Sequence, residues 1–164
     1  MKRTLLYLAF ALALLGLDIV SKGVVYRDLA PLIMQKPGEG IPIFQNFLGV
    51  DFFLGLTFNK GAAWGLFSNF NFLLILVRIA IVIALFIYLI RFCKNRALVF
   101  PFVLILTGAI GNILDFFLYG FVIDFFHFRF WGHSFPLFNV ADALISIGVT
   151  ILFFNLYFKK HARV

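Results

Sequence analysis

The sequence predicts an all-α membrane protein with four transmembrane helices, a small outer β-sheet and an interfacial segment. The chain is 63% hydrophobic and only 13% charged, with 25 Phe among its 164 residues, a composition outside the range of soluble domains. A helix that crosses the hydrocarbon core needs about 20 residues, so four such helices and their connections fill this length. We therefore expect a single membrane-embedded domain over residues 1–164.

The basic residues predict the topology. Their excess gives a net charge of +7, but they cluster at the ends of apolar runs and do not form the mixed polar patch that a nucleic-acid site requires. Because Lys and Arg mark cytoplasmic loops, both termini and the middle loop should be cytoplasmic, with the other connections facing outward. The three basic groups are Lys2 and Arg3; Arg91, Lys94 and Arg96; and Lys159, Lys160 and Arg163.

The first predicted helix covers residues 4–25 and contains two opposite charges. Asp18 and Lys22 lie four residues apart on one helical face, where they can pair and lower the cost of burial. Two interpretations remain open: an ion pair that anchors the helix end at the outer interface, or a direct contact with substrate.

Residues 26–70 are predicted to form a non-helical outer segment. Pro31, Pro37 and Pro42 should break any helix here. Residues 43–47 and 50–58 have the aromatic and β-branched content of strands, which predicts a small sheet lying on the bilayer surface. The segment ends in small residues around Gly61 that would let the backbone approach a ligand or another helix.

The second and third helices are predicted at residues 72–90 and from about Leu98 onward. The second carries Arg78, which we expect to snorkel outward. In the third, Gly108, Ala109 and Gly111 form a small surface suited to close helix packing. Asn112 and Asp115 follow on one face, and we interpret this polar pair as a contact between helices.

Residues 121–136 are rich in aromatics and predict an interfacial segment, which contains Asp124. The last helix is predicted at residues 138–158. Its first turn carries Asn139 and Asp142, three residues apart on a shared face. Asp142 should therefore lie near the outer surface, where it could meet Asp124.

These carboxylates are the candidate catalytic groups. The few serines lack the context of a nucleophile, and the only Glu, Glu39, is far from any histidine. Asp124 and His127 have spacing that could ligate a metal, but a histidine in an aromatic loop is more often structural, so we expect neither a metal nor another cofactor. Two adjacent carboxylates can instead act as an acid and a base, because burial and repulsion raise one pKa.

Three functions fit buried carboxylates. The first is a peptidase in which Asp124 and Asp142 activate water at the membrane surface. The second is a small proton- or ion-coupled transporter, which would place its carboxylates nearer the bilayer midplane. The third is a non-catalytic assembly factor in which the polar pairs only hold helices together. The position of the aspartates at segment ends favours the peptidase.

Five motifs in this order resemble lipoprotein signal peptidase (signal peptidase II), an aspartic membrane protease family. They cover residues 18–142, nearly the whole chain. The motifs are Asp18-x-x-x-Lys22, Asn59-Lys60-Gly61-Ala62-Ala63-Trp64-Gly65, Gly111-Asn112-Ile113-Leu114-Asp115, Val122-Ile123-Asp124-Phe125-Phe126 and Phe138-Asn139-Val140-Ala141-Asp142.

The resemblance implies a catalytic pair, Asp124 and Asp142, at the outer face of the bacterial cytoplasmic (inner) membrane. It implies as substrate a diacylglyceryl-modified prolipoprotein, cut just before its lipid-bearing cysteine. We also expect the chain to act as a monomer among membrane lipids. Phe116 stands where the family usually has Arg. Arg78 or Arg129 could take over the role of that arginine. The implied substrate-binding or supporting residues are Asn59, Gly61, Asn112, Asp115, Asn139, Ala141, Asp18 and Lys22.

Overall fold

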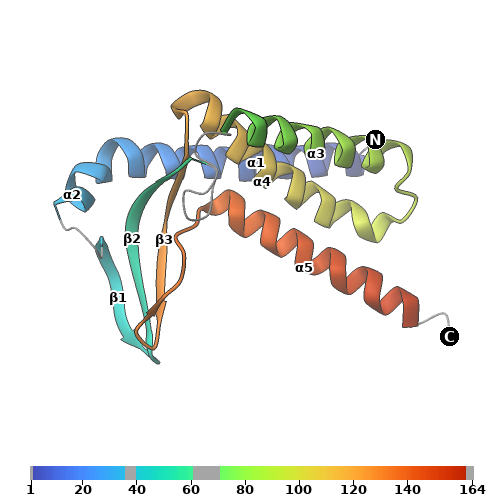
Figure 1. Cartoon of the computed structure of the whole chain (residues 1–164). Helices are drawn as coiled ribbons and strands as arrows, with labels where there is room; N and C mark the ends of the chain where they lie inside the picture. Colours follow the sequence, from blue (N-terminus) through green and yellow to red (C-terminus); the bar gives the residue numbers. More distant parts are fainter. Residues whose placement is uncertain (1, 36–39, 61–70, 162–164) are drawn as a thin grey trace.

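The computed structural model describes residues 2–35, 40–60 and 71–161. Within them, four helical segments are long and apolar enough to cross a membrane: Lys2–Met34, Phe72–Arg91, Arg96–Tyr119 and Val140–Phe158. They form a bundle, and a four-stranded antiparallel sheet extends from one end of it (Figure 1). The predicted fold class, four membrane helices with a small sheet, is confirmed.

The first helix is longer than the sequence predicted. The helix α1 (Lys2–Val24) continues through a π-helical turn, η1 (Val25–Leu29), into the short helix α2 (Ala30–Met34). The expectation that prolines break any helix from residue 26 onward is therefore wrong. Pro31 lies in the first turn of α2, directly after the π-helical turn, so its missing N–H falls where the regular α-helical hydrogen bonding is already interrupted.

The sheet has the strand order β1-β2-β3-β4. Strands β1 (Ile41–Phe47) and β2 (Val50–Asn59) match the predicted pair. Strands β3 (Val122–Phe130) and β4 (His133–Ser134) lie within residues 121–136, which were predicted only as an interfacial segment. The strand β3 was missed because neighbours cover most of it on both faces, so it lacks the alternation of apolar and polar residues that marks a half-exposed strand.

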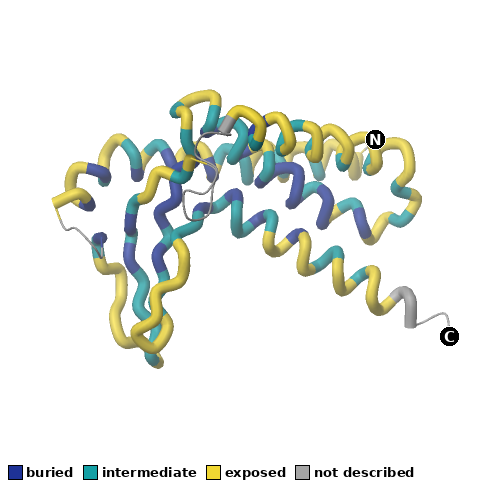
Figure 2. Tube along the Cα trace, viewed as in Figure 1, coloured by how far each residue is buried: buried dark blue, intermediate teal, exposed yellow. Residues whose placement is uncertain are grey.

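The helix α4 (Val99–Tyr119) is central to the bundle, packing against α1, α3 (Asn71–Arg91) and α5 (Val140–His161). A short 3-10 turn, η4 (Arg96–Leu98), leads into it, and Pro101 lies in its first turn as predicted. Buried residues concentrate in α4 and along β2 and β3 (Figure 2). The sheet therefore continues the buried core of the bundle beyond the helix ends.

Glycines on α4 and α5 allow the helices to approach closely. A Cβ on Gly108 would collide with the carbonyl oxygen of Ala141, and one on Gly148 would lie 2.8 Å from the carbonyl oxygen of Pro101. A Cβ on Gly111 would come within 2.5 Å of a carboxylate oxygen of Asp18. The small surface predicted on the third helix thus faces both α5 and α1, at the level of the polar residues described next.

Candidate active site

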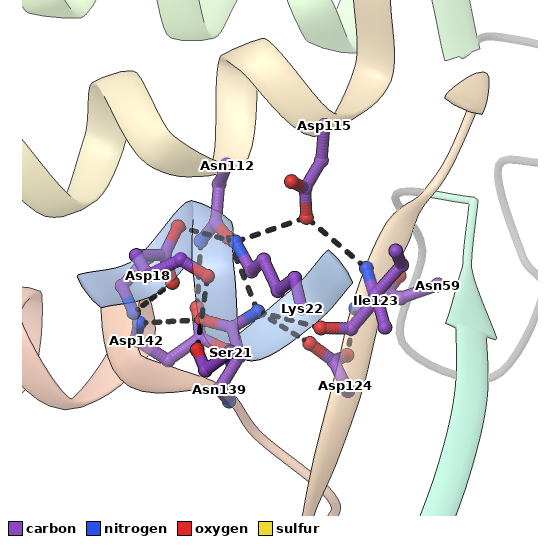
Figure 3. A network of polar contacts seen from close by, with 11 residues as sticks. Asp18, Ser21, Lys22, Asn59, Asn112, Asp115, Ile123, Asp124, Asn139 and Asp142 are labelled. Atoms are coloured by element: carbon purple, nitrogen blue, oxygen red, sulfur yellow. Dashed lines mark hydrogen bonds and ion pairs between the residues drawn. The ribbon is translucent and has the colours of Figure 1, made fainter. Parts of the chain in front are cut away.

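Lys22 occupies the centre of a buried polar network where α1, α4, α5 and β3 meet (Figure 3). Its side chain is fully buried, and its ammonium donates to Asp18 Oδ2 at 2.8 Å and to Asn112 Oδ1 at 3.1 Å. It also forms an ion pair with Asp115 Oδ2 at 2.9 Å. An ammonium has three N–H donors, so each one has a partner.

Each carboxylate paired with Lys22 also binds a backbone N–H on another element. Asp18 Oδ1 accepts from Ala141 N at 2.8 Å, and Asp115 Oδ2 accepts from Ile123 N at 3.2 Å. Ala141 directly precedes Asp142, and Ile123 directly precedes Asp124. One lysine and two carboxylates therefore fix the backbone next to both remaining aspartates of the network.

The ion pair predicted between Asp18 and Lys22 is confirmed. Both residues lie inside the bundle, at 1% and 0% exposed. They connect α1 to α4 and α5. Asp115 has the helix-to-helix role expected of it, with β3 as an additional partner.

Asn112 connects the lysine to Asp142. Its Oδ1 accepts from Lys22 and, at 3.2 Å, from Asn139 Nδ2, while its Nδ2 donates to Asp142 Oδ1 at 2.8 Å. Because Lys22 can only donate hydrogen bonds, it requires the amide oxygen to face it. The lysine therefore determines that Asn112 presents its N–H to Asp142.

Asn139 and Asp142 form a reciprocal cap at the start of α5. Asn139 Oδ1 accepts from Asp142 N at 2.9 Å, and Asp142 Oδ2 accepts from Asn139 N at 3.3 Å. This is the geometry of a capping box, with Asp in the third helical position. The half-buried carboxylate of Asp142 is thus held at the positive end of a helix.

Asn139 also reaches Asp124, so one amide links the two aspartates. Its Nδ2 donates to Asp124 Oδ1 at 2.7 Å and lies 3.3 Å from the carbonyl oxygen of Ile123. The second oxygen of Asp124 accepts from Asn59 Nδ2 at 3.1 Å, across the β2–β3 pair. Asn139 itself is fully buried.

Asp124 has a strongly perturbed acidity. It is 2% exposed, and burial, followed by repulsion from Asp142, raises the pKa of Asp124 from 3.8 to about 7. The hydrogen bonds from Asn59 and Asn139 oppose the rise, but loss of solvation outweighs them. A carboxyl group with this pKa can donate a proton near neutral pH.

The structure brings together nine of the ten residues singled out from the sequence. The tenth, Gly61, lies outside the described residues. Ile123 was not anticipated, because it contributes a backbone N–H and its side chain carries no polar signal. The nine residues are Asp18, Lys22, Asn59, Asn112, Asp115, Asp124, Asn139, Ala141 and Asp142.

His127 and Arg129 take part in other contacts. The His127 ring packs 5.7 Å from the Phe53 ring, with Nε2 3.3 Å from Ser134 Oγ. Since residues three apart on a strand face opposite sides, His127 does not share the face of Asp124. Among the described residues, no group of three or more His, Cys, Asp or Glu has the arrangement of a metal site.

Arg129 forms an ion pair with Asp51 at 2.8 Å on the sheet. Arg129, one of the two arginines considered for the role of the arginine usual at position 116, thus pairs with a carboxylate on β2. Phe116 instead packs against the ring of Phe117.

Comparison with known proteins supports a common origin for this architecture. The family described as Signal peptidase (SPase) II matches residues 10–158. A lipoprotein signal peptidase of Chlamydia pneumoniae is 42% identical over 149 residues, which cover 87% of this chain and 84% of the relative. One from Geobacillus thermodenitrificans is 34% identical over 157 residues, covering 95% and 92%.

Two solved structures, each described as a bacterial membrane enzyme, share the fold. The first superposes with a TM-score of 0.76 at 26% identity, covering 96% of this chain and 91% of the other. The second has a TM-score of 0.69 at 28% identity, covering 92% and 91%. The extent of the family match and the similarity to these relatives show that the chain belongs to the signal peptidase II family.

Proposed function

We propose that this protein is an aspartic endopeptidase that removes the signal peptide from diacylglyceryl-modified prolipoproteins at the outer face of the cytoplasmic membrane. The observation that carries the proposal is the Asn139 bridge. One buried amide donates to Asp124 at 2.7 Å and accepts from the backbone of Asp142 at 2.9 Å. The Asn139 side chain thus holds two carboxyl groups close together. In such a pair one group can act as a general acid and the other as a general base.

The environments of the two aspartates support different roles. Asp124 is buried, and burial raises its pKa to about 7, so we assign Asp124 as the member that donates a proton. Asp142 is half-buried at a helix N-terminus and accepts N–H hydrogen bonds from Asn112 and Asn139. The Asp142 carboxylate is therefore the base in our proposal.

In the proposed reaction, the Asp142 carboxylate removes a proton from water as the water oxygen attacks the scissile carbonyl carbon. The Asp124 carboxyl group gives its proton to the carbonyl oxygen, which yields a neutral tetrahedral diol. On collapse, the C–N bond breaks, Asp142 gives its proton to the leaving nitrogen, and Asp124 regains a proton from a diol hydroxyl. Both aspartates return to their starting states, and the chain needs no cofactor for these steps.

The location and substrate rest on charge, position and family membership. Basic residues near both termini and between α3 and α4 support a cytoplasmic location for those regions. The polar network lies at the opposite ends of α1 and α4, beside the sheet (Figure 1). A lipid-modified precursor anchored in the outer leaflet would present its cleavage site at this level. We propose that the chain acts there as one domain and as a monomer.

The test uses purified protein with two matched precursor peptides, one carrying diacylglyceryl on its cysteine and one without lipid. We expect a mass shift for cleavage before the cysteine in the lipid-modified peptide only. Equal cleavage of both peptides would contradict lipid-dependent recognition while leaving the peptidase assignment intact. If neither peptide is cleaved, the peptidase assignment itself fails.

A further inference from the structure

The far tip of the sheet contains two side-by-side turns with an unusual backbone. In the first, Leu48 and Gly49 connect the paired residues Phe47 and Val50. In the second, Trp131 and Gly132 connect Phe130 and His133. Trp131 N donates to Gly49 O at 2.7 Å, so the two turns form one structural unit, called the tip here.

Both turns place a large apolar residue where the backbone disfavours it. The φ angles are 53° at Leu48 and 81° at Gly49, and 47° at Trp131 and 81° at Gly132. Positive φ at both central positions is the pattern of a type I′ turn, in which Asn, Asp or Gly is preferred at the first position. Leu and Trp at those positions are strained, and the same exception occurs in two adjacent turns.

The strained side chains do not pack into the core. Leu48 is 81% exposed and Trp131 is 76% exposed, with Phe47 beside them at 66%. Folding the chain therefore gains little from these side chains, although their backbone conformation is unfavourable. Packing within the molecule does not compensate for this backbone strain. Such uncompensated strain indicates that the two side chains contact something outside the molecule.

The surrounding structure holds the tip in this conformation. A Cβ on Gly49 would lie 2.5 Å from Trp131 Nε1, which shows that the indole packs directly on the first turn. Behind the tip, Asp51 accepts from the backbone N of Asn46 at 2.7 Å and pairs with Arg129 at 2.8 Å. Asp51 and Arg129 therefore neutralise each other, which lowers the cost of bringing the tip near a medium of low polarity.

The direction of the strands indicates what that medium is. The strands run across the ends of the membrane helices, and the tip projects sideways beyond the bundle (Figure 1). Lipid surrounds the bundle on that side, so the tip overlies the outer leaflet. Trp is enriched at membrane–water interfaces, where its amphipathic ring sits at the level of the headgroups.

We propose that Phe47, Leu48 and Trp131 form a lipid anchor that inserts at the headgroup and acyl-chain boundary of the outer leaflet. The anchor holds β2 and β3 at the membrane surface. Because β3 is one continuous strand from Phe130 back to Asp124, the anchor also sets the level of Asp124 relative to lipid. It is independent of the peptidase chemistry and would exist in a catalytically inactive variant.

The test uses the small number of tryptophans. The chain has two, so Trp64→Phe leaves Trp131 as the only indole. This variant is reconstituted into vesicles whose lipids carry bromine either near the headgroup end of the acyl chains or near the chain ends. We expect the shallow bromines to remove about half or more of the Trp131 emission, the deep ones to remove less, and aqueous iodide to have little effect.

Two outcomes would overturn the anchor. Strong quenching by iodide with none by either brominated lipid would place the tip in water. Quenching that depends on the protein-to-lipid ratio would identify a second copy of the chain as the contact. If Trp64→Phe fails to fold, the difference in emission between the unsubstituted protein and Trp131→Phe gives the same measurement.

A second variant separates the turn from the anchor. Leu48→Asn supplies a residue that the turn prefers, so we expect a higher thermal midpoint in detergent together with weaker quenching of Trp131 by shallow bromine. Ile43→Asn is the matched control, because Ile43 is an exposed apolar residue of β1 outside the turns. It should leave the quenching unchanged, and an equal loss in both variants would contradict a specific role for the tip.

Discussion

Two pairs of carboxylates lie close together in this molecule and differ in the groups that surround them. Asp18 and Asp115 share the ammonium of Lys22 at 2.8 and 2.9 Å. Among the described residues, the side chains that hydrogen-bond to Asp124 and Asp142 are the amides of Asn59, Asn112 and Asn139. One pair is therefore fixed by a cation and the other by neutral donors.

The difference explains how one small bundle can contain both a structural and a reactive carboxylate pair. Two carboxylates around one cation form a buried charge cluster, and each of them has a second task in holding a backbone N–H. Amides orient a carboxylate without cancelling its charge, so the loss of solvation on burial prevails at Asp124, and repulsion from Asp142 adds to it. A raised pKa follows at Asp124.

The largest expected effect is on catalysis. Asp124→Asn and Asp142→Asn each remove a group that transfers a proton, and turnover of a lipid-modified precursor should fall by about 10²- to 10⁴-fold. The mass-shift assay described above measures this, with the thermal midpoint as a check on folding. Asp28→Asn is the matched control, since Asp28 is an exposed residue of η1 outside the network, and it should retain turnover. Near-normal activity in either first variant would refute the dyad.

The next effect is on stability. Lys22→Met leaves two buried carboxylates without their cation, which typically costs about 3 to 5 kcal/mol. We expect a large fall in the thermal midpoint in detergent. Adding Asp18→Asn and Asp115→Asn to Lys22→Met removes the uncompensated charges and should recover part of the loss. A single variant as stable as the unsubstituted protein would show that the cluster is not structural.

A smaller effect is expected from pH. The pKa of Asp124 is about 7 in the folded chain against an ordinary 3.8, so the folded state binds this proton more tightly than the unfolded state does. The resulting stability is fully present below about pH 4 and is lost as pH rises through about 7. Thermal midpoints of the unsubstituted protein should therefore fall over this window.

The control for the pH effect is Asp124→Asn, which removes the titrating group. Its midpoint should fall less over the same window, and identical pH slopes for the two proteins would contradict the assignment. Because the protonated form of Asp124 is the proposed acid, turnover should also fall about tenfold per pH unit above about pH 7.

The smallest effect is expected at the exposed ion pair of the sheet. Asp51 and Arg129 are partly open to solvent, with side chains 15% and 28% exposed. Arg129→Gln should lower the thermal midpoint in detergent far less than Lys22→Met does, because a solvent-screened ion pair contributes little. A loss as large as that of Lys22→Met would mean that the contrast between the buried cluster and the exposed pair is wrong.

Much of the candidate site was predictable because its residues are polar in an apolar sequence. Asp18, Lys22, Asp115 and Asp142 are conspicuous for that reason, and their spacing along helices is fixed by the helical period. The position of Asp124 was noted, but not that it lies on a strand. The contribution of Ile123 had no sequence signal, because every residue except proline carries a backbone N–H.

The sequence by itself determined the class of protein, the approximate positions of the four membrane helices and the set of polar residues, since hydrophobicity and period are local properties. Only the tertiary structure decided how those residues share partners. Lys22 is 90 residues from Asn112, and Asp18 is 123 residues from Ala141. Which carboxylates share the lysine and which keep their repulsion depends on helix packing and strand pairing across those distances, and no local pattern encodes that choice.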